Sequence, residues 1–167
     1  VSADLMSITW NITPGIKWSD GSAFTAHDVV FSGEYCMDPD GGCAQSNKLA
    51  DVSNIEALDD LTVKVSFSVA KPFPYGPFVG AEQPIIQKAQ FADCKGAKAP
   101  ECTAENFGPI GTGPFVVTDF KANDVITMEA NPHYRDASKP AFASVTFKGG
   151  GDAAAAARSV LETGEFD

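Results

Sequence analysis

The chain has 167 residues, 44% of them hydrophobic, and its 12 basic and 22 acidic side chains give a formal net charge of -10 at pH 7. This length and hydrophobic content are enough to bury a core, which excludes an intrinsically disordered protein. The acidic balance argues against nucleic acid and anionic lipid as partners, because both require a basic surface. The sequence contains no apolar run of about eighteen residues, so we expect no membrane-spanning helix.

The two ends of the sequence suggest that it is a piece of a longer protein. The start, VSADLMSITWNIT, has neither the charged region nor the apolar stretch of a signal peptide. A strand-like alternation follows almost at once, and the chain stops at LETGEFD, shortly after an expected helix. We therefore expect an excised or proteolysed fragment.

The first third of the chain predicts a strand, a turn and a helix. Apolar and polar residues alternate from Ile8 to Ile12, which is typical of a half-buried strand. The stretch Trp18-Ser19-Asp20-Gly21 has the composition of a turn. Thr25 and Asp28 have the spacing of a capping box with Asp in the place of Glu, so a helix should follow to about Tyr35.

The middle of the chain predicts one hairpin among loops. Val63, Val65 and Phe67 alternate with polar residues, and an Asp59-Asp60 turn precedes them, so 52–58 and 61–67 should pair. The flanking segments are expected to be loops with little regular structure, or short apolar connections; they are 37–47, 71–78, 84–86 and 90–106.

A second module is expected from Gly108 onward. It should hold a hairpin, a further strand and an alanine-rich helix that Asp152 caps and Gly164 ends; the segments are 115–120, 125–129, 142–148 and 153–162. Because strands and helices do not alternate regularly, the sequence predicts an α+β fold of mixed sheet and hairpins with a few helices. A doubly wound parallel sheet is not indicated.

The four cysteines fall into two close pairs in the sequence, and they allow three disulfide connectivities. Pairing between neighbours, Cys36 with Cys43 and Cys94 with Cys102, is the most economical arrangement. Four free thiols remain the alternative, whereas the spacing fits a structural zinc site poorly. Disulfides would place the protein outside the cytosol.

One polar stretch, IKWSDGSAFTAHDVVF, raises the possibility of a hydrolase. His27 could serve as a general base with Ser19, Ser22 or Asp28 nearby. However, a turn followed by a helix cap accounts for every polar residue in the stretch, and no nucleophile-elbow motif is present. The sequence therefore favours a structural role here and no enzyme.

Other candidate sites are weaker. Asp38-Pro39-Asp40-Gly41-Gly42 lacks the glycine and glutamate that an EF-hand calcium loop requires, and the glycine-rich segment 108–114 lacks the lysine of a P-loop. His27 and His133 are the only histidines, so no histidine metal site and no cofactor is expected. The aromatic residues Phe73, Tyr75 and Phe78 could wall a ligand cleft or fold over their own core.

Four motifs in order resemble the extracellular solute-binding proteins of family 5, the peptide- and nickel-type receptors of ABC importers. They are PGIKWSDG with FTAHDVVFS (14–32), ALDDLTV (57–63), GTGPF (111–115) with NPHY (131–134), and GEFD (164–167). The cysteine pairs are not general features of that family. The resemblance runs nearly from end to end.

The resemblance implies a part of a two-lobed receptor with a type II periplasmic-binding-protein fold. Residues 1–107 would form the extra subdomain of the first lobe, 108–167 would begin the return to its core, and the second lobe would be absent. It also implies weak ligand-binding candidates near the cleft: Tyr35, Gly80, Glu82 and Gln83.

The function that the resemblance implies is non-enzymatic capture of a small solute outside the cytoplasm, in the periplasm or on the cell surface. The solute would be a peptide, opine, nickel chelate or oligosaccharide, and a membrane ABC permease would receive it. Two other hypotheses stay open from the residues alone: a small hydrolase, and an isolated structural or interaction domain.

Overall fold

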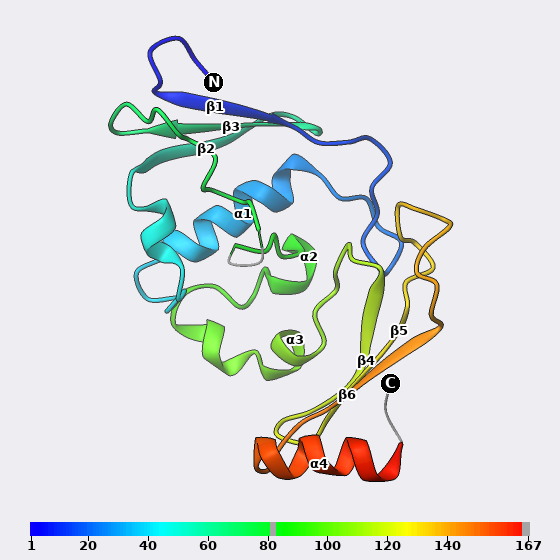
Figure 1. The fold of residues 1–167 in the computed structure, drawn as a ribbon. Coiled ribbons are helices and arrows are strands. Elements are labelled where there is room, and N and C mark those ends of the chain that lie inside the picture. The colour runs from blue at the N-terminus through cyan, green and yellow to red at the C-terminus, as the bar shows by residue number, and fades with distance from the viewer. Residues whose placement is uncertain (81–82, 165–167) are drawn as a thin grey trace.

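Two separate three-stranded antiparallel sheets organise the chain in the computed structural model, which describes residues 1–80 and 83–164 (Figure 1). The first sheet has the order β1-β3-β2, with β1 at Ser7–Asn11, β2 at Val52–Asp59 and β3 at Thr62–Phe67. The second has the order β4-β5-β6. This mixture of sheets and helices is the α+β class that the sequence predicts.

The first sheet buries one face under helix α1, which spans Ala26–Met37 (Figure 1). The central strand β3 alternates as predicted: Val63 and Val65 have no exposed area, and Phe67 is buried beside them. Across the interface α1 contributes Ala26 and Val29 to the same cluster. The period-two pattern of β3 therefore defines the core of this half of the chain.

The start of α1 is held by the carboxylate of Asp28, which is 6% exposed. Its Oδ2 accepts hydrogen bonds from the backbone N–H of Thr25 at 2.9 Å and from the indole N–H of Trp18 at 3.3 Å. Its Oδ1 accepts from the backbone N–H of Lys88 at 3.0 Å. One buried anion thus joins the helix cap, the preceding turn and a segment sixty residues further on.

Short helices lie where the sequence predicts a loop with little regular structure, so that expectation for 90–106 was wrong. They are α2 (Lys88–Phe91), the 3-10 helix Gly96–Glu101 and α3 (Thr103–Phe107), and a further 3-10 helix covers Ser46–Leu49. Buried Phe91 and Cys94 pack against Phe31 of α1. Tertiary packing on α1 therefore stabilises helices too short to be stable alone.

Both disulfides join neighbouring cysteines, which confirms the pairing that the sequence favours. Cys36 at the end of α1 bonds to Cys43, and Cys94 bonds to Cys102, with Cα atoms 5.0 and 5.9 Å apart. None of the cysteines is free. The two bridges fix the loops that flank the short helices.

The second sheet carries much less core. It consists of β4 (Phe115–Lys121), β5 (Val125–Ala130) and β6 (Ser144–Lys148), and β6 begins two residues later than predicted. Helix α4 (Ala153–Thr163) is capped as expected: the Asp152 carboxylate accepts from the Ala155 N–H at 2.9 Å, and Gly164 has a φ of 61°. All residues of α4 are exposed.

We expect Asp28→Asn to lower the free energy of unfolding by about 1–3 kcal/mol, because the new amide NH2 must face one of the buried N–H donors. Urea denaturation measures this loss. Asp93→Asn, at an exposed position after α2, should change stability by less than about 0.5 kcal/mol. Equal effects for the two variants would contradict the proposed role of the carboxylate.

Each disulfide closes a short loop and so reduces the entropy of the unfolded chain. Removing either one, as Cys36→Ala/Cys43→Ala or Cys94→Ala/Cys102→Ala, should lower the free energy of unfolding by about 2–3 kcal/mol. The two losses should be similar because the two loops are of similar length. Thermal melting of each double variant against the parent tests this. In the unreduced, denatured parent an alkylating reagent should label no cysteine, and after reduction it should label all four. Labelling before reduction would contradict the pairing.

Candidate functional site

The turn Trp18–Gly21 lies against the segments that follow α3 and β5. The backbone N–H of Ser19 donates to the carbonyl of Gly111 at 2.9 Å. Gly21 has a φ of +86°, and a Cβ built on it would lie 3.1 Å from Nε2 of His133. Only glycine combines this backbone conformation with this close approach. Residues from two of the four motifs, 14–32 and 111–115 with 131–134, therefore meet at one place.

The buried side chain of Asn131 lies at the same junction, where the turn Trp18–Gly21 meets the segments after α3 and β5. Its side-chain N–H donates to the carbonyl of Gly113 at 2.7 Å, and its Oδ1 accepts from the backbone N–H of His133 at 2.9 Å. Its own backbone N–H donates to the Pro114 carbonyl at 2.9 Å. These bonds fix the turn that carries the next residues, Tyr134 and Arg135.

The polar residues that suggested a hydrolase are engaged in structure. His27 is well exposed, and its Nε2 lies 3.6 Å from the Asp60 carboxylate. In the part of the chain that the structure describes, His27 makes no hydrogen bond to serine or cysteine. The Ser22 hydroxyl donates to Asp20 at 2.6 Å and accepts from the Gln87 amide at 3.0 Å. Together with the Gln87 amide, Ser22 lowers the pKa of Asp20 below its usual value.

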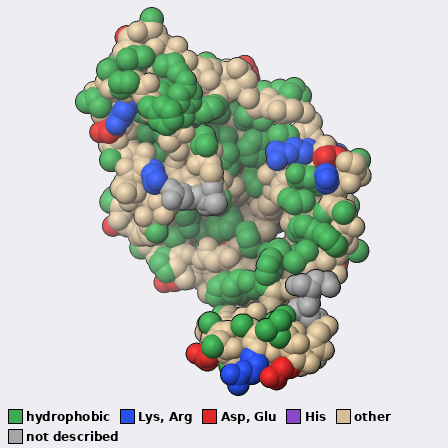
Figure 2. All heavy atoms as spheres, viewed as in Figure 1, with side chains coloured by type: hydrophobic (Ala, Val, Ile, Leu, Met, Phe, Trp, Pro, Cys, Tyr) green, Lys and Arg blue, Asp and Glu red, His purple; other side chains and the backbone are tan. Residues whose placement is uncertain are grey.

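An open pocket of about 550 Å³ lies between α1, the first sheet and the junction described above. Figure 2 shows hydrophobic side chains gathered in a hollow on this face of the molecule. Apolar side chains from distant segments line it, among them Ile12, Phe24, Val29, Phe78 and Ile85. Its volume and apolar walls are those of a small-molecule site.

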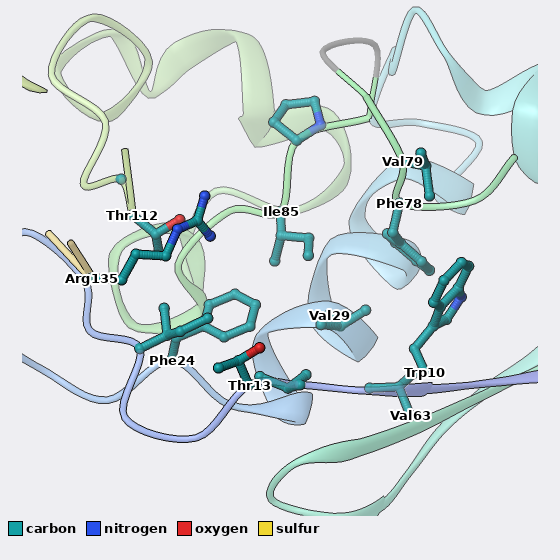
Figure 3. Close-up of a pocket in the computed structure, with 14 residues that line it drawn as sticks. Trp10, Thr13, Phe24, Val29, Val63, Phe78, Val79, Ile85, Thr112 and Arg135 are labelled. Atoms are coloured by element: carbon teal, nitrogen blue, oxygen red, sulfur yellow. The ribbon is translucent and has the colours of Figure 1, made fainter. Parts of the chain in front are cut away.

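Few polar groups line this pocket. They are the Thr13 and Thr112 hydroxyls, the Arg135 guanidinium and the Trp10 indole. In Figure 3 Arg135 and Thr112 lie at the end away from Trp10, and the guanidinium extends into the pocket toward Ile85. Among the described residues of this lining, Arg135 alone is charged. The buried Nε1–H of Trp10 has no hydrogen-bond partner among the described residues.

Sequence analysis did not identify Arg135 as a site residue. Its pocket is assembled from residues between Trp10 and Arg135, and no local pattern reveals such a distant combination. One signal was available: Arg135 is one of only two arginines in an acidic chain, and it directly follows the NPHY motif. Of the aromatic residues considered for a cleft wall, Phe78 lines this pocket, whereas the Phe73 side chain is 78% exposed elsewhere.

Two predicted ligand-binding residues, Tyr35 and Gln83, share a smaller pocket of about 120 Å³. Burial raises the pKa of the Tyr35 hydroxyl above its usual value. The side-chain oxygen Oε1 of Gln83 accepts a hydrogen bond from the Phe78 backbone N–H at 3.1 Å. Gly80 lines neither this pocket nor the larger one. Glu82 lies outside the described residues.

The described residues offer one group with metal-ligand spacing, in which ligand atoms of Cys94, Cys102 and Glu105 lie within 4.8 Å of one another. Because the two sulfurs are joined in a disulfide, they are not available as thiolate ligands. The acidic stretch at Asp38 is a turn, in which the carboxylate accepts from the Asp40 N–H at 2.9 Å. Neither group fits a metal ion.

The sequence model of the bacterial extracellular solute-binding proteins, family 5 Middle, matches residues 1–167. The chain belongs to this family. Among curated relatives it is 29% identical to the glutathione-binding protein GsiB of Pectobacterium atrosepticum, over 99% of this chain and 30% of that protein. The chain thus spans less than a third of that relative's length.

Similar solved structures support this family assignment. AgaA from A. tumefaciens R10, determined with agropinic acid, matches with a TM-score of 0.85 and 27% identity over 100% of this chain and 32% of that one. The substrate-binding protein CtaP from Listeria monocytogenes matches with a TM-score of 0.83 and 27% identity, over 98% of this chain and 33% of that one. The described fold is therefore the one found in substrate-binding proteins of ABC transporters.

The family consists of binding proteins of transporters rather than enzymes, and its members act in the periplasm or outside the cell. Within the described residues, no helix has the length and apolar character needed to cross a membrane.

Gly21→Ala should destabilise the protein more than Gly15→Ala, although both glycines have a positive φ. A Cβ at Gly15 meets nothing within 4 Å, whereas one at Gly21 meets the His133 ring. We expect a difference of about 1–3 kcal/mol in the free energy of unfolding. In a His133→Ala background most of this difference should disappear. Its persistence there would show that the His133 contact is not the cause.

Proposed function

We propose that the chain is part of the solute-binding component of an ABC importer, which captures a small solute outside the cytoplasm and delivers it to a membrane permease. The observation that carries this proposal is the match of the family along all 167 residues. The two disulfides support a location outside the reducing cytosol, in the periplasm or on the cell surface.

The division into subdomains is part of this proposal. Residues 1–107 hold the first sheet with its own buried cluster, and 108–167 hold the second sheet. We infer that the first segment is the extra subdomain of one lobe and that the second begins the return to the lobe core. A second lobe, from sequence beyond this chain, would close over the solute.

The relatives support a class of solute. The named ligands of similar proteins are glutathione and agropinic acid. A peptide-like or other small polar solute is therefore our first expectation for this chain, with opines, nickel chelates and oligosaccharides as the wider range. The pocket of about 550 Å³ is the surface that the chain would contribute to the binding cleft. Tyr35, Gly80 and Gln83 stay predicted neighbours of that cleft.

The test is native mass spectrometry of the whole protein that contains this chain, purified without added ligand from its own host. We expect a mass excess from a non-covalent solute, which should vanish when the same sample is sprayed from denaturing solvent. Deletion of the gene should then reduce uptake of that solute.

The proposal fails if the folded protein carries no solute and if short peptides, glutathione and agropinic acid leave its melting temperature unchanged. Turnover of any of these compounds would favour an enzyme instead. A loss of turnover in His27→Ala would then implicate the polar stretch around that histidine.

A further inference from the structure

We propose that the pocket between α1, the first sheet and the Asn131 turn binds a solute that carries a carboxylate beside an apolar body, and that Arg135 anchors the carboxylate. This inference rests on the proposed solute-binding function and goes further, because it names the ligand chemistry and the residue that selects it.

The walls of the pocket define the apolar part of the ligand. Phe24, Val29, Phe78 and Ile85 are among the apolar residues that line it, and the volume of about 550 Å³ suits a molecule of several hundred daltons or a short peptide segment. Burial of apolar ligand surface there would supply most of the affinity. It would not discriminate strongly between solutes of similar size.

The charge of the pocket indicates the polar part of the ligand. Arg135 makes no hydrogen bond and no ion pair with the described residues, although the chain has 22 acidic side chains. Its guanidinium stays 5.5 Å from the ring centroid of Tyr134, a cation–π contact. The group extends into the pocket (Figure 3). An unpaired guanidinium beside apolar walls offers a planar pair of donors that matches a carboxylate.

The remaining polar groups fit the same ligand. Among the described residues, no carboxylate side chain lines the pocket. The hydroxyls of Thr13 and Thr112 can donate as well. The pocket therefore presents donors to a ligand that brings acceptors. A cationic solute would leave the guanidinium unpaired and repelled.

The backbone that carries Arg135 is anchored, although the Arg135 side chain itself is exposed. The preceding turn is held by the buried Asn131 side chain, which bonds to the Gly113 carbonyl and the His133 N–H. Thr112 belongs to the same glycine-containing segment. The backbones that carry the Arg135 guanidinium and the Thr112 hydroxyl are thus held by the same Asn131 side chain.

The test uses a matched pair of probes, N-acetylphenylalanine and N-acetylphenylalaninamide, which differ in the carboxylate alone. Binding to the whole protein, freed of any solute it carries, is measured by calorimetry or by chemical-shift titration. We expect the acid to bind about tenfold to a hundredfold more tightly than the amide. Arg135→Gln should remove this preference, and Arg135→Lys should retain part of it.

The control is Arg158→Gln, at the other arginine of the chain, in exposed α4, which should leave the preference unchanged. Circular dichroism and melting temperature must show that the Arg135→Gln protein is folded. A folded Arg135→Gln protein that keeps the preference for the acid would overturn the assignment.

Three other results would overturn this inference. They are equal binding of acid and amide, competition by inorganic phosphate as strong as by the acid, and failure of both probes to bind at millimolar concentration. The last result would arise if another segment of the whole protein fills the pocket. If native mass spectrometry still finds a bound solute, the solute-binding function remains supported, and only the proposed role of Arg135 as carboxylate anchor is wrong.

Discussion

The buried carboxylate of Asp28 is the interaction on which the first half of the molecule depends. A buried anion without a cation is tolerated only when hydrogen-bond donors replace its lost hydration. Here the donors are backbone and indole N–H groups from the turn before α1, from its cap and from the start of α2. Because each donor belongs to a different segment, the carboxylate connects α1 to the turn at Trp18 and to the start of α2 at Lys88. Helix α1 then covers the first sheet.

A second polar side chain, Asn131, does the same for the connection to the second sheet. It joins the glycine-containing segment before β4 to the turn after β5, and Gly21 packs against the neighbouring His133 ring. The motifs that mark the family are therefore contact points between segments. Their polar side chains bond to neighbouring segments of the fold, which explains why the motifs identify the family more clearly than the ligand.

Local sequence patterns were sufficient to predict the strands and the longer helices. The alternation at Val63 and Val65 predicted β3, and Asp152 with Gly164 predicted the two ends of α4. The short helices between Lys88 and Phe107 could not be predicted, because their stability comes from packing on α1 and from a disulfide. The pocket could not be predicted either, since strand, helix and turn residues up to 125 positions apart meet only in the folded chain.

Scaffold and recognition are therefore assigned to different polar groups. The side chains of Asp28 and Asn131 and the amide nitrogen of Gln87 are engaged with the protein, so a ligand could recruit these atoms only by breaking bonds that hold the fold. Arg135, by contrast, contributes no ion pair to the described structure and lies at the edge of an apolar pocket. Substitution there changes the charge offered to a solute while the interlocked turns stay intact. A solute-binding protein built as we propose can change its ligand without losing its fold.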